Sequence, residues 1–225
     1  MCGIIGISSN KSVSSNIINS LKKLEYRGYD SAGIATLSDG FINEVKSEGR
    51  VENLENNFDL KNLSGNIGIG HVRWATHGVP NSVNAHPHSS ENVSVVHNGI
   101  IENSTLLKKY LLSKGHKFKS KSDSEVILHA YVEWGEDFIN KLEGMFAFVL
   151  WDEKKERFIF ARDGVGIKPL YYYKDDDSII FSSELDPIIE LANQKLKLSI
   201  KINILLLFLN IINISKNMIS IYIMI

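Results

Sequence analysis

The order of short strand patterns and helical patterns along this chain restricts its fold more than any other feature. Runs typical of strands occupy residues 3–9, 32–37, 41–46, 67–73, 93–97, 145–151, 157–162, 170–173 and 178–182. Helical patterns occupy residues 13–24, 104–113, a stretch that begins at Ser122 or Asp123, and 184–192. Short strands between two sets of helices predict a layered α+β domain over residues 1–193.

The first helical pattern is specific enough to predict where it ends. Apolar side chains recur at helical spacing from Val13 to Leu24. We expect Gly28 to stop this helix in the left-handed conformation, which glycine adopts without steric cost.

The composition changes abruptly after Asn193. Residues 194–225 contain no Gly, Ala, Pro, Asp, Glu, Arg, Thr or Val, and Lys216 is the only charge between residues 202 and 225. We predict that this low-complexity tail, rich in Ile, Asn and Leu, is a truncation or frameshift product. A membrane anchor is disfavoured because asparagines interrupt the apolar run. A genuine packed segment is the remaining alternative.

Charge and cysteine usage argue against several classes of protein. The chain has 25 Lys and Arg side chains and 26 Asp and Glu side chains, so nothing favours nucleic acid or a membrane surface as a partner. The single cysteine excludes an internal disulfide framework and fits a reducing compartment. The N-terminus lacks the basic leader of a secretory signal. We therefore predict a cytoplasmic location.

The first chemical clue is Cys2, which leads directly into an apolar strand. Cysteine is small enough for Met1 to be removed before it, which leaves a thiol and a free α-amine on one residue. An α-amine has a pKa of about 7.7–8 and is partly neutral near pH 7, so it can accept the thiol proton. We predict that Cys2 is a nucleophile activated by its own amine. The alternative is an incidental residue at a frayed terminus.

The second clue is Asn98-Gly99, which follows the strand pattern 93–97. Hydrolysis of an amide builds negative charge on the carbonyl oxygen, and fixed donors aimed at that oxygen lower the barrier. The side-chain amide of Asn98 and the backbone N–H of Gly99 can supply two such donors, because glycine allows close approach of the backbone. The alternative is a plain Asn-Gly hairpin turn.

The third and fourth clues are polar groups suited to a free amino acid. Arg73 presents a planar fork that fits an α-carboxylate, and Thr76 and His77 can add hydrogen bonds. Trp74 can cover the site, and Asp123 can pair with an α-ammonium group. The alternatives are an ordinary polar loop and a helix cap at Asp123. Together with the first two clues, these residues match free glutamine, which presents an amide, a carboxylate and an ammonium group.

A metal site is disfavoured, although five of the seven histidines lie between residues 71 and 97. His86 and His88 are two residues apart, no HExxH motif is present, and no acidic residue lies between residues 71 and 90. We predict neither a metal nor a cofactor.

Several segments, taken together, resemble a known family. They are MCGIIGI at 1–7, LEYRGYDSAGIA at 24–35, GHVRWATHG at 70–78, NAHPH at 84–88 and HNGIIEN at 97–103. Over roughly residues 1–124 the chain closely resembles the glutaminase domain of the glutamine–fructose-6-phosphate aminotransferase (isomerizing) family. The resemblance implies the four-layer αββα sandwich of the N-terminal-nucleophile (Ntn) hydrolases, with two antiparallel sheets packed face to face and helices outside.

The same resemblance implies roles for individual residues. Cys2 would attack the side-chain amide of L-glutamine, while Asn98 and Gly99 would hold the oxyanion. The positions that resemble glutamine-binding or gating residues of the family are Arg73, Trp74, Thr76, His77, His86 and Asp123. Residues 27–31 resemble the segment that packs beside the nucleophile.

The second half of the chain resembles a different family more closely. Residues 122–173 and the FSSEL motif look like the glutaminase domain of asparagine synthetases. We expect glutamine hydrolysis that supplies ammonia for glucosamine 6-phosphate synthesis. The alternatives are an asparagine synthetase-like enzyme, an inactive glutamine-binding fragment, or an amidase of another substrate.

The catalytic domains that would use the ammonia are not in this sequence. We expect a fragment or a split subunit whose partner is a separate synthase/isomerase domain, with homo-oligomerisation through that domain.

Overall fold

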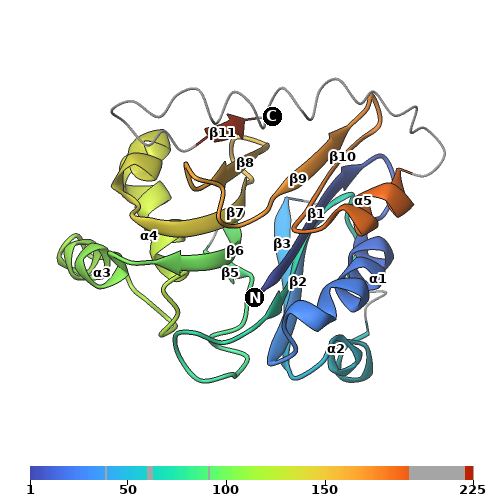
Figure 1. Cartoon of the computed structure of the whole chain (residues 1–225), viewed down its shortest axis with the longest axis horizontal. Coiled ribbons are helices and arrows are strands. Elements are labelled where there is room, and N and C mark those ends of the chain that lie inside the picture. Colours follow the sequence, from blue (N-terminus) through green and yellow to red (C-terminus); the bar gives the residue numbers. More distant parts are fainter. Residues whose placement is uncertain (39, 60–62, 91, 193–220, 225) are drawn as a thin grey trace.

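Two antiparallel β-sheets packed face to face, with helices on the outer face of each, make up the fold in the computed structural model (Figure 1). The structure describes residues 1–38, 40–59, 63–90, 92–192 and 221–224. In chain order the elements are β1 (Gly3–Ser9), α1 (Ser14–Leu24), η1 (Glu25–Arg27), β2 (Ser31–Ser38), β3 (Phe41–Glu48), α2 (Val51–Asn57), β4 (Ile67–Arg73), β5 (His88–Ser89), β6 (Val93–Ile101), α3 (Ser104–Ser113), α4 (Glu125–Trp134), η3 (Gly135–Lys141), β7 (Gly144–Asp152), β8 (Arg157–Arg162), β9 (Tyr171–Lys174), β10 (Ser178–Ser182), α5 (Leu185–Leu191) and β11 (Ile221–Met224). The predicted α+β class and αββα layering are confirmed.

The N-terminal strand lies in the interior of the first sheet. That sheet has the strand order β3-β2-β4-β1-β10-β9, and α1, α2 and α5 cover its outer face (Figure 1). The second sheet has the order β11-β8-β7-β6-β5, with α3 and α4 outside. Because β4 and β10 pair with β1 on its two sides, the start of the chain is held firmly rather than frayed.

Alternate side chains of each strand enter different apolar layers. Ile5 of β1 belongs to the cluster beneath α1, whereas Ile4 belongs to the cluster between the sheets, together with Ile69 and Val96. A third cluster joins β6 and β7 to α4. This alternation follows from the two-residue period of a strand and decides which side chains face the other sheet.

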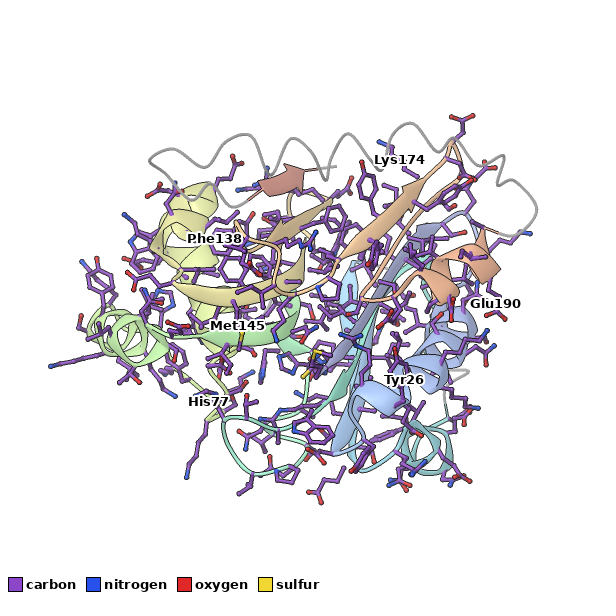
Figure 2. The ribbon with its side chains drawn as sticks, viewed as in Figure 1. Tyr26, His77, Phe138, Met145, Lys174 and Glu190 are labelled. Atoms are coloured by element: carbon purple, nitrogen blue, oxygen red, sulfur yellow. The ribbon has the colours of Figure 1, made fainter. Side chains whose placement is uncertain are left out.

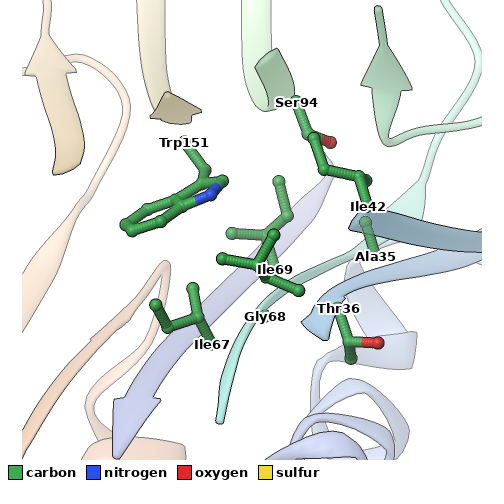
Figure 3. Close-up of a pocket in the computed structure, with 9 residues that line it drawn as sticks. Ala35, Thr36, Ile42, Ile67, Gly68, Ile69, Ser94 and Trp151 are labelled. Atoms are coloured by element: carbon green, nitrogen blue, oxygen red, sulfur yellow. The ribbon is translucent and has the colours of Figure 1, made fainter. Parts of the chain in front are cut away.

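The space between the sheets holds one very small cavity, at the β4 end that begins with Ile67. It has a volume of about 10 Å³ and is lined mainly by apolar side chains, with Trp151 above Ile67 and Ile69 (Figure 3). That volume accommodates about one water molecule. This cavity is therefore too small for a substrate.

The predicted conformation of Gly28 is wrong. α1 ends at Leu24, η1 follows it, and Gly28 is extended with φ −176°. A Cβ at this position would lie 2.5 Å from the carbonyl carbon of Arg73 and 2.6 Å from the backbone nitrogen of Trp74. The glycine is required by close packing of two backbones, not by a left-handed helix cap.

The hairpin-turn alternative for Asn98-Gly99 is also wrong. Both residues lie inside β6, opposite Ala147 and Phe146 of β7. Gly99 has φ +139°, and a Cβ there would lie 2.0 Å from the carbonyl oxygen of Met145. Only glycine satisfies both the conformation and the close approach.

The other predicted strands and helices are present, with small differences at their ends. α2 and the two-residue β5 were not predicted from the sequence. Asp123 does not cap α4, which begins at Glu125. Instead, the Asp123 carboxylate accepts a hydrogen bond from the backbone N–H of Ile101 at 2.9 Å.

Part of the C-terminal tail is included in the structure. Residues 221–224 form β11, which pairs with β8. Residues 194–220 and 225 lie outside the described residues, so the origin of the tail stays a prediction. No helix in the described part of the chain is long and apolar enough to cross a membrane.

Candidate active site

The thiol of Cys2 is held between the two backbone polar groups of one residue. The Trp74 N–H donates to Sγ at 3.4 Å, and Sγ lies 3.6 Å from the Trp74 carbonyl oxygen, to which the thiol donates. Arg27 Nε donates to the Cys2 carbonyl at 2.9 Å, and the Arg27 guanidinium pairs with Glu184. Cys2 is therefore fixed at both its side chain and its backbone.

Residues 27–31 support the peptide that holds this thiol. Asp30 donates its backbone N–H to the Arg73 carbonyl at 3.0 Å and accepts the Ala75 N–H on Oδ2 at 2.8 Å. Gly28 packs closely against the backbone of Arg73 and Trp74. The structure thus places this segment beside the candidate nucleophile.

Burial shifts the thiol and the terminal amine in opposite directions. It raises the pKa of the Cys2 thiol above its ordinary value, although the backbone hydrogen bond from Trp74 opposes this shift. It lowers the pKa of the N-terminal α-amine, which Met1 carries here. The thiol therefore needs a proton acceptor close by, and a neutral amine is suited to that role. The Met1 side chain is 63% exposed, so this residue is accessible for removal.

Asn98 and Cys2 each stand two residues from a side chain of the cluster between the sheets. Asn98 follows Val96 on β6, and Cys2 precedes Ile4, directly before β1 begins. Asn98 is 1% exposed, and its Nδ2 has no hydrogen-bond partner among the described residues. A buried donor left unpaired costs folding free energy. Such a donor is well suited to a ligand oxygen.

The backbone N–H of Gly99 points away from β7. The Asp163 N–H donates to the Phe146 carbonyl at 2.8 Å, and the Phe146 N–H donates to Asp163 Oδ2 at 3.3 Å. Phe146 is opposite Gly99, so the two form a non-hydrogen-bonded pair and the polar groups of Gly99 face the other side of β6. On that side β5 pairs with Ser94 and Val95, several residues away. The role of this N–H as a second oxyanion donor stays a prediction.

A polar cleft lies beside the start of α4. It has a volume of about 110 Å³ and is lined by His77, Ser104, Thr105, Lys108, Lys121, Ser122, Asp123 and Val126. Asp123 is 7% exposed, and its Oδ1 lies 3.7 Å from His77 Nδ1. Figure 2 shows His77 on the loop that lies below the sheets in this view. This cleft combines the buried carboxylate of Asp123 with the half-buried Lys108 and the exposed Lys121, which suits a zwitterion.

Arg73 braces the loop that carries the other predicted residues. Its guanidinium donates to the carbonyl oxygens of His77 and Val79. Thr76 Oγ1 lies 3.3 Å from His77 Nδ1. Trp74 is 47% exposed, with its ring edge-to-face with another aromatic ring. The structure brings Arg73, Thr76 and His77 together, close in the chain to the residue whose backbone holds the Cys2 thiol. Their contacts with substrate stay a prediction.

His86 lies in a buried histidine cluster away from the cleft. Its ring stacks on that of His71 at 4.0 Å, and the ring of His88 packs against it edge-on at 4.6 Å. Neither ring nitrogen of His86 has a partner in the described part of the chain. Its assignment to substrate binding stays a prediction. No group of three or more His, Cys, Asp or Glu side chains in the described ranges is arranged to hold a metal ion.

Burial keeps the histidine cluster uncharged. It lowers the pKa of His71 and of His88 to about 3, and that of His97 to about 4. It lowers the pKa of His86 well below its ordinary value as well. These imidazoles are therefore neutral wherever the protein is folded near pH 7.

Mild acid should destabilise the protein. An unfolded histidine titrates at about pH 6.5, so between about pH 6.5 and pH 4 the unfolded chain binds more protons than the folded one. Each buried histidine then lowers the free energy of unfolding by up to about 1.4 kcal/mol per pH unit. Thermal unfolding should give a Tm that is level above about pH 7 and falls below about pH 6.5. His88→Leu removes one titrating group and should flatten the fall. A Tm unchanged down to about pH 5 contradicts this expectation.

Sequence reasoning missed three groups that shape the site. His71 joins the sheets through the carbonyl of His97, and Ser124 bonds to the His97 ring. Asp163 accepts the backbone N–H of Phe146, the residue opposite Gly99, on the side away from β6. Their importance depends on contacts between distant segments, for which the sequence carries no local signal.

Known proteins match this chain in sequence and in fold. Residues 59–225 match the model of the glutamine amidotransferase domain family. A glutamine–fructose-6-phosphate aminotransferase (isomerizing) of Clostridium acetobutylicum is 44% identical over 217 residues, covering 82% of this chain and 36% of that protein. One of Mesorhizobium japonicum is 45% identical over 175 residues, covering 73% of this chain and 29% of that protein. The chain thus spans about a third of the length of these relatives.

The solved structures agree with the sequence relatives. The glutamine phosphoribosylpyrophosphate amidotransferase of B. subtilis, complexed with ADP and GMP, has a TM-score of 0.75 and 29% identity, covering 85% of this chain and 44% of that one. A glutamine aminotransferase class-II domain protein of Silicibacter pomeroyi has a TM-score of 0.56 at 14% identity, covering 80% and 88%, and shows the fold alone. With the Ntn layering, a family match over most of its length and these relatives, the chain belongs to the glutamine amidotransferase domain family.

Proposed function

We propose that this chain hydrolyses L-glutamine to glutamate and ammonia, with Cys2 as the nucleophile. One observation carries the proposal. The only thiol in the chain is fixed by the backbone of Trp74, and the buried side-chain nitrogen of Asn98 has no hydrogen-bond partner among the described residues. A fixed nucleophile and an unsatisfied donor are the two parts that amide hydrolysis requires.

The proposed reaction runs through a thioester. After removal of Met1, the α-amine of Cys2 takes the thiol proton, and the thiolate attacks the side-chain carbonyl carbon of glutamine. Asn98 Nδ2 and the Gly99 N–H bind the resulting oxyanion. The protonated amine gives its proton to the leaving nitrogen, the C–N bond breaks and ammonia departs. Water, deprotonated by the same amine, then cleaves the thioester to release glutamate.

We further propose that the ammonia serves glutamine–fructose-6-phosphate aminotransfer. Curated relatives with that name are 44% and 45% identical to this chain. The chain spans about a third of their length. In this proposal a synthase/isomerase domain carries out the acceptor reaction. The partner, oligomerisation through it and the cytoplasmic location stay predictions.

The test is glutamate release by the full chain. Incubation with L-glutamine should give glutamate and ammonia in equal amounts. Glutamine blocked at the α-carboxylate or at the α-amine should be a much poorer substrate, because Arg73 and Asp123 would lose their partners. Equal turnover of free and blocked glutamine would indicate an amidase of another substrate. Binding of glutamine without turnover would indicate an inactive fragment.

Asp123→Asn should weaken glutamine binding. The amide oxygen can still accept the Ile101 N–H, but the negative charge beside the substrate ammonium is lost. Hydrogen bonds to charged groups are worth about 1.5–3 kcal/mol, so KM should rise roughly 10- to 100-fold with a smaller change in kcat. Steady-state kinetics measure this effect.

Glu125→Gln is the matched control for Asp123→Asn. Glu125 is also buried near the start of α4, but its carboxylate accepts the backbone N–H groups of Lys119 and Ser120 at 2.7 Å. This variant should lower Tm and leave KM within a few-fold of the parent value. A similar KM for both variants would argue against an ammonium partner at Asp123.

A further inference from the structure

We infer that His71 is a positioning residue that sets the oxyanion-binding strand against the nucleophile. His71 lies on β4 in the first sheet, and its Nε2 is 2.9 Å from the carbonyl oxygen of His97 on β6 in the second sheet. A carbonyl oxygen only accepts, so the ring donates through Nε2–H. The His71 side chain is fully buried, so water does not compete for this bond.

The two ends of this hydrogen bond lead directly to the reacting groups. His71 is three residues before Trp74, whose backbone holds the thiol of Cys2. The His97 carbonyl belongs to the peptide unit that joins His97 to Asn98. Fixing that carbonyl therefore fixes the peptide plane that ends at the Cα of Asn98, from which the Asn98 side chain projects. The peptide unit that carries the Gly99 N–H follows directly after this Cα.

The orientation of the His71 ring is itself constrained. The ring of His86 stacks on it with centroids 4.0 Å apart and an interplanar angle of 28°. The acceptor residue is held from its other side, because His97 Nδ1 lies 2.8 Å from Ser124 Oγ. Hydrogen bonds therefore connect β4, which leads into Trp74, with β6 and with Ser124 just before α4.

The expected effect is on turnover and not on glutamine binding. Displacement of a catalytic group by about 1 Å costs roughly 100-fold in rate. The Asp123 carboxylate is held by the Ile101 N–H, a hydrogen bond in which the His71 ring takes no part. His71→Leu removes the donor and fills its place in the buried cluster with an apolar side chain. It should lower kcat roughly 10- to 100-fold and leave KM within a few-fold. His71→Gln, whose amide nitrogen can reach the His97 carbonyl, should retain most of kcat.

The experiment compares these variants in the full chain, with His88→Leu as the control. His88 is a buried histidine of the same cluster that makes no hydrogen bond to the His97 carbonyl in the described structure. Its replacement should lower Tm as much as His71→Leu does but leave kcat unchanged. A glutamine analogue with an aldehyde in place of the amide gives a second readout, because its thiol adduct carries the oxyanion. Its affinity should fall in His71→Leu by the same factor as kcat.

Three results overturn the positioning role. One is an unchanged kcat in folded His71→Leu, and another is an equal loss of kcat in His88→Leu. If His71→Leu does not fold, His71→Asn and His71→Gln replace it: the shorter amide cannot reach the carbonyl, so equal kcat values in these two contradict the proposal. This inference rests on the proposed glutaminase activity. Failure of that function is recognised separately, because the parent chain would then release no glutamate.

Discussion

Replacing Cys2 with alanine should abolish glutamate release from glutamine. The thiol is the only nucleophile of its kind in the chain, and the Trp74 backbone holds it in place. Without it no thioester forms, and the remaining donors cannot replace covalent catalysis. Loss of a nucleophile costs on the order of 10⁴-fold or more in kcat, so turnover should fall to background in a glutamate assay.

The same variant should still bind glutamine. Alanine leaves Asn98, Arg73 and Asp123 in place, so saturating glutamine should raise the Tm of Cys2→Ala above the Tm of the same variant without glutamine. Residual turnover within about tenfold of the parent would contradict a nucleophilic role for Cys2. Loss of both binding and the folded state would point to a structural role instead.

Asn98→Ala should be the second most damaging substitution for catalysis. Its Nδ2 is buried and unpartnered among the described residues, so it is available for the oxyanion that develops in the transition state. Removal of one such donor costs roughly 10²–10³-fold in kcat. KM should change little, because a ground-state amide oxygen gains less from this donor than the oxyanion does.

Asn103→Ala is the matched control for Asn98→Ala. The Asn103 amide donates to the Lys141 carbonyl at 2.8 Å and accepts the Glu143 N–H at 3.2 Å, so both of its polar atoms serve the fold. This variant should lose stability and keep kcat, whereas Asn98→Ala should lose kcat and keep most of its stability. Loss of kcat in Asn103→Ala with an unchanged kcat in Asn98→Ala would contradict the role of Asn98 as an oxyanion donor.

The layering of the fold could be predicted from local patterns and family resemblance. The strands from β1 to β10, apart from the two-residue β5, appear as apolar or alternating runs, and the sheets are antiparallel as expected. Gly28 shows where this reasoning ends. The sequence shows a glycine at this position, but the reason that a glycine is needed is the close approach of the Arg73 and Trp74 backbone, far away in sequence. A single chain pattern carries no information on such close approaches.

In the candidate site too, local sequence predicted some residues, whereas contacts between distant segments decide others. Residue chemistry singled out Cys2, Asn98 and Asp123, and the structure places them around the start of β1, the end of β6 and the start of α4. His71 and Asp163 were missed, because each acts through a backbone group of another strand. A buried histidine within an apolar strand is indistinguishable by sequence from one that merely fills the core.

The central claim is that a thiol and an amine on one residue carry the reaction. The most direct measurement is mass spectrometry of the N-terminal peptide after incubation with an electrophilic glutamine analogue. We expect a peptide that begins at Cys2, without Met1, and carries the added mass on that residue in proportion to lost activity. A fully active protein that retains Met1, or an adduct on any other residue, would contradict it.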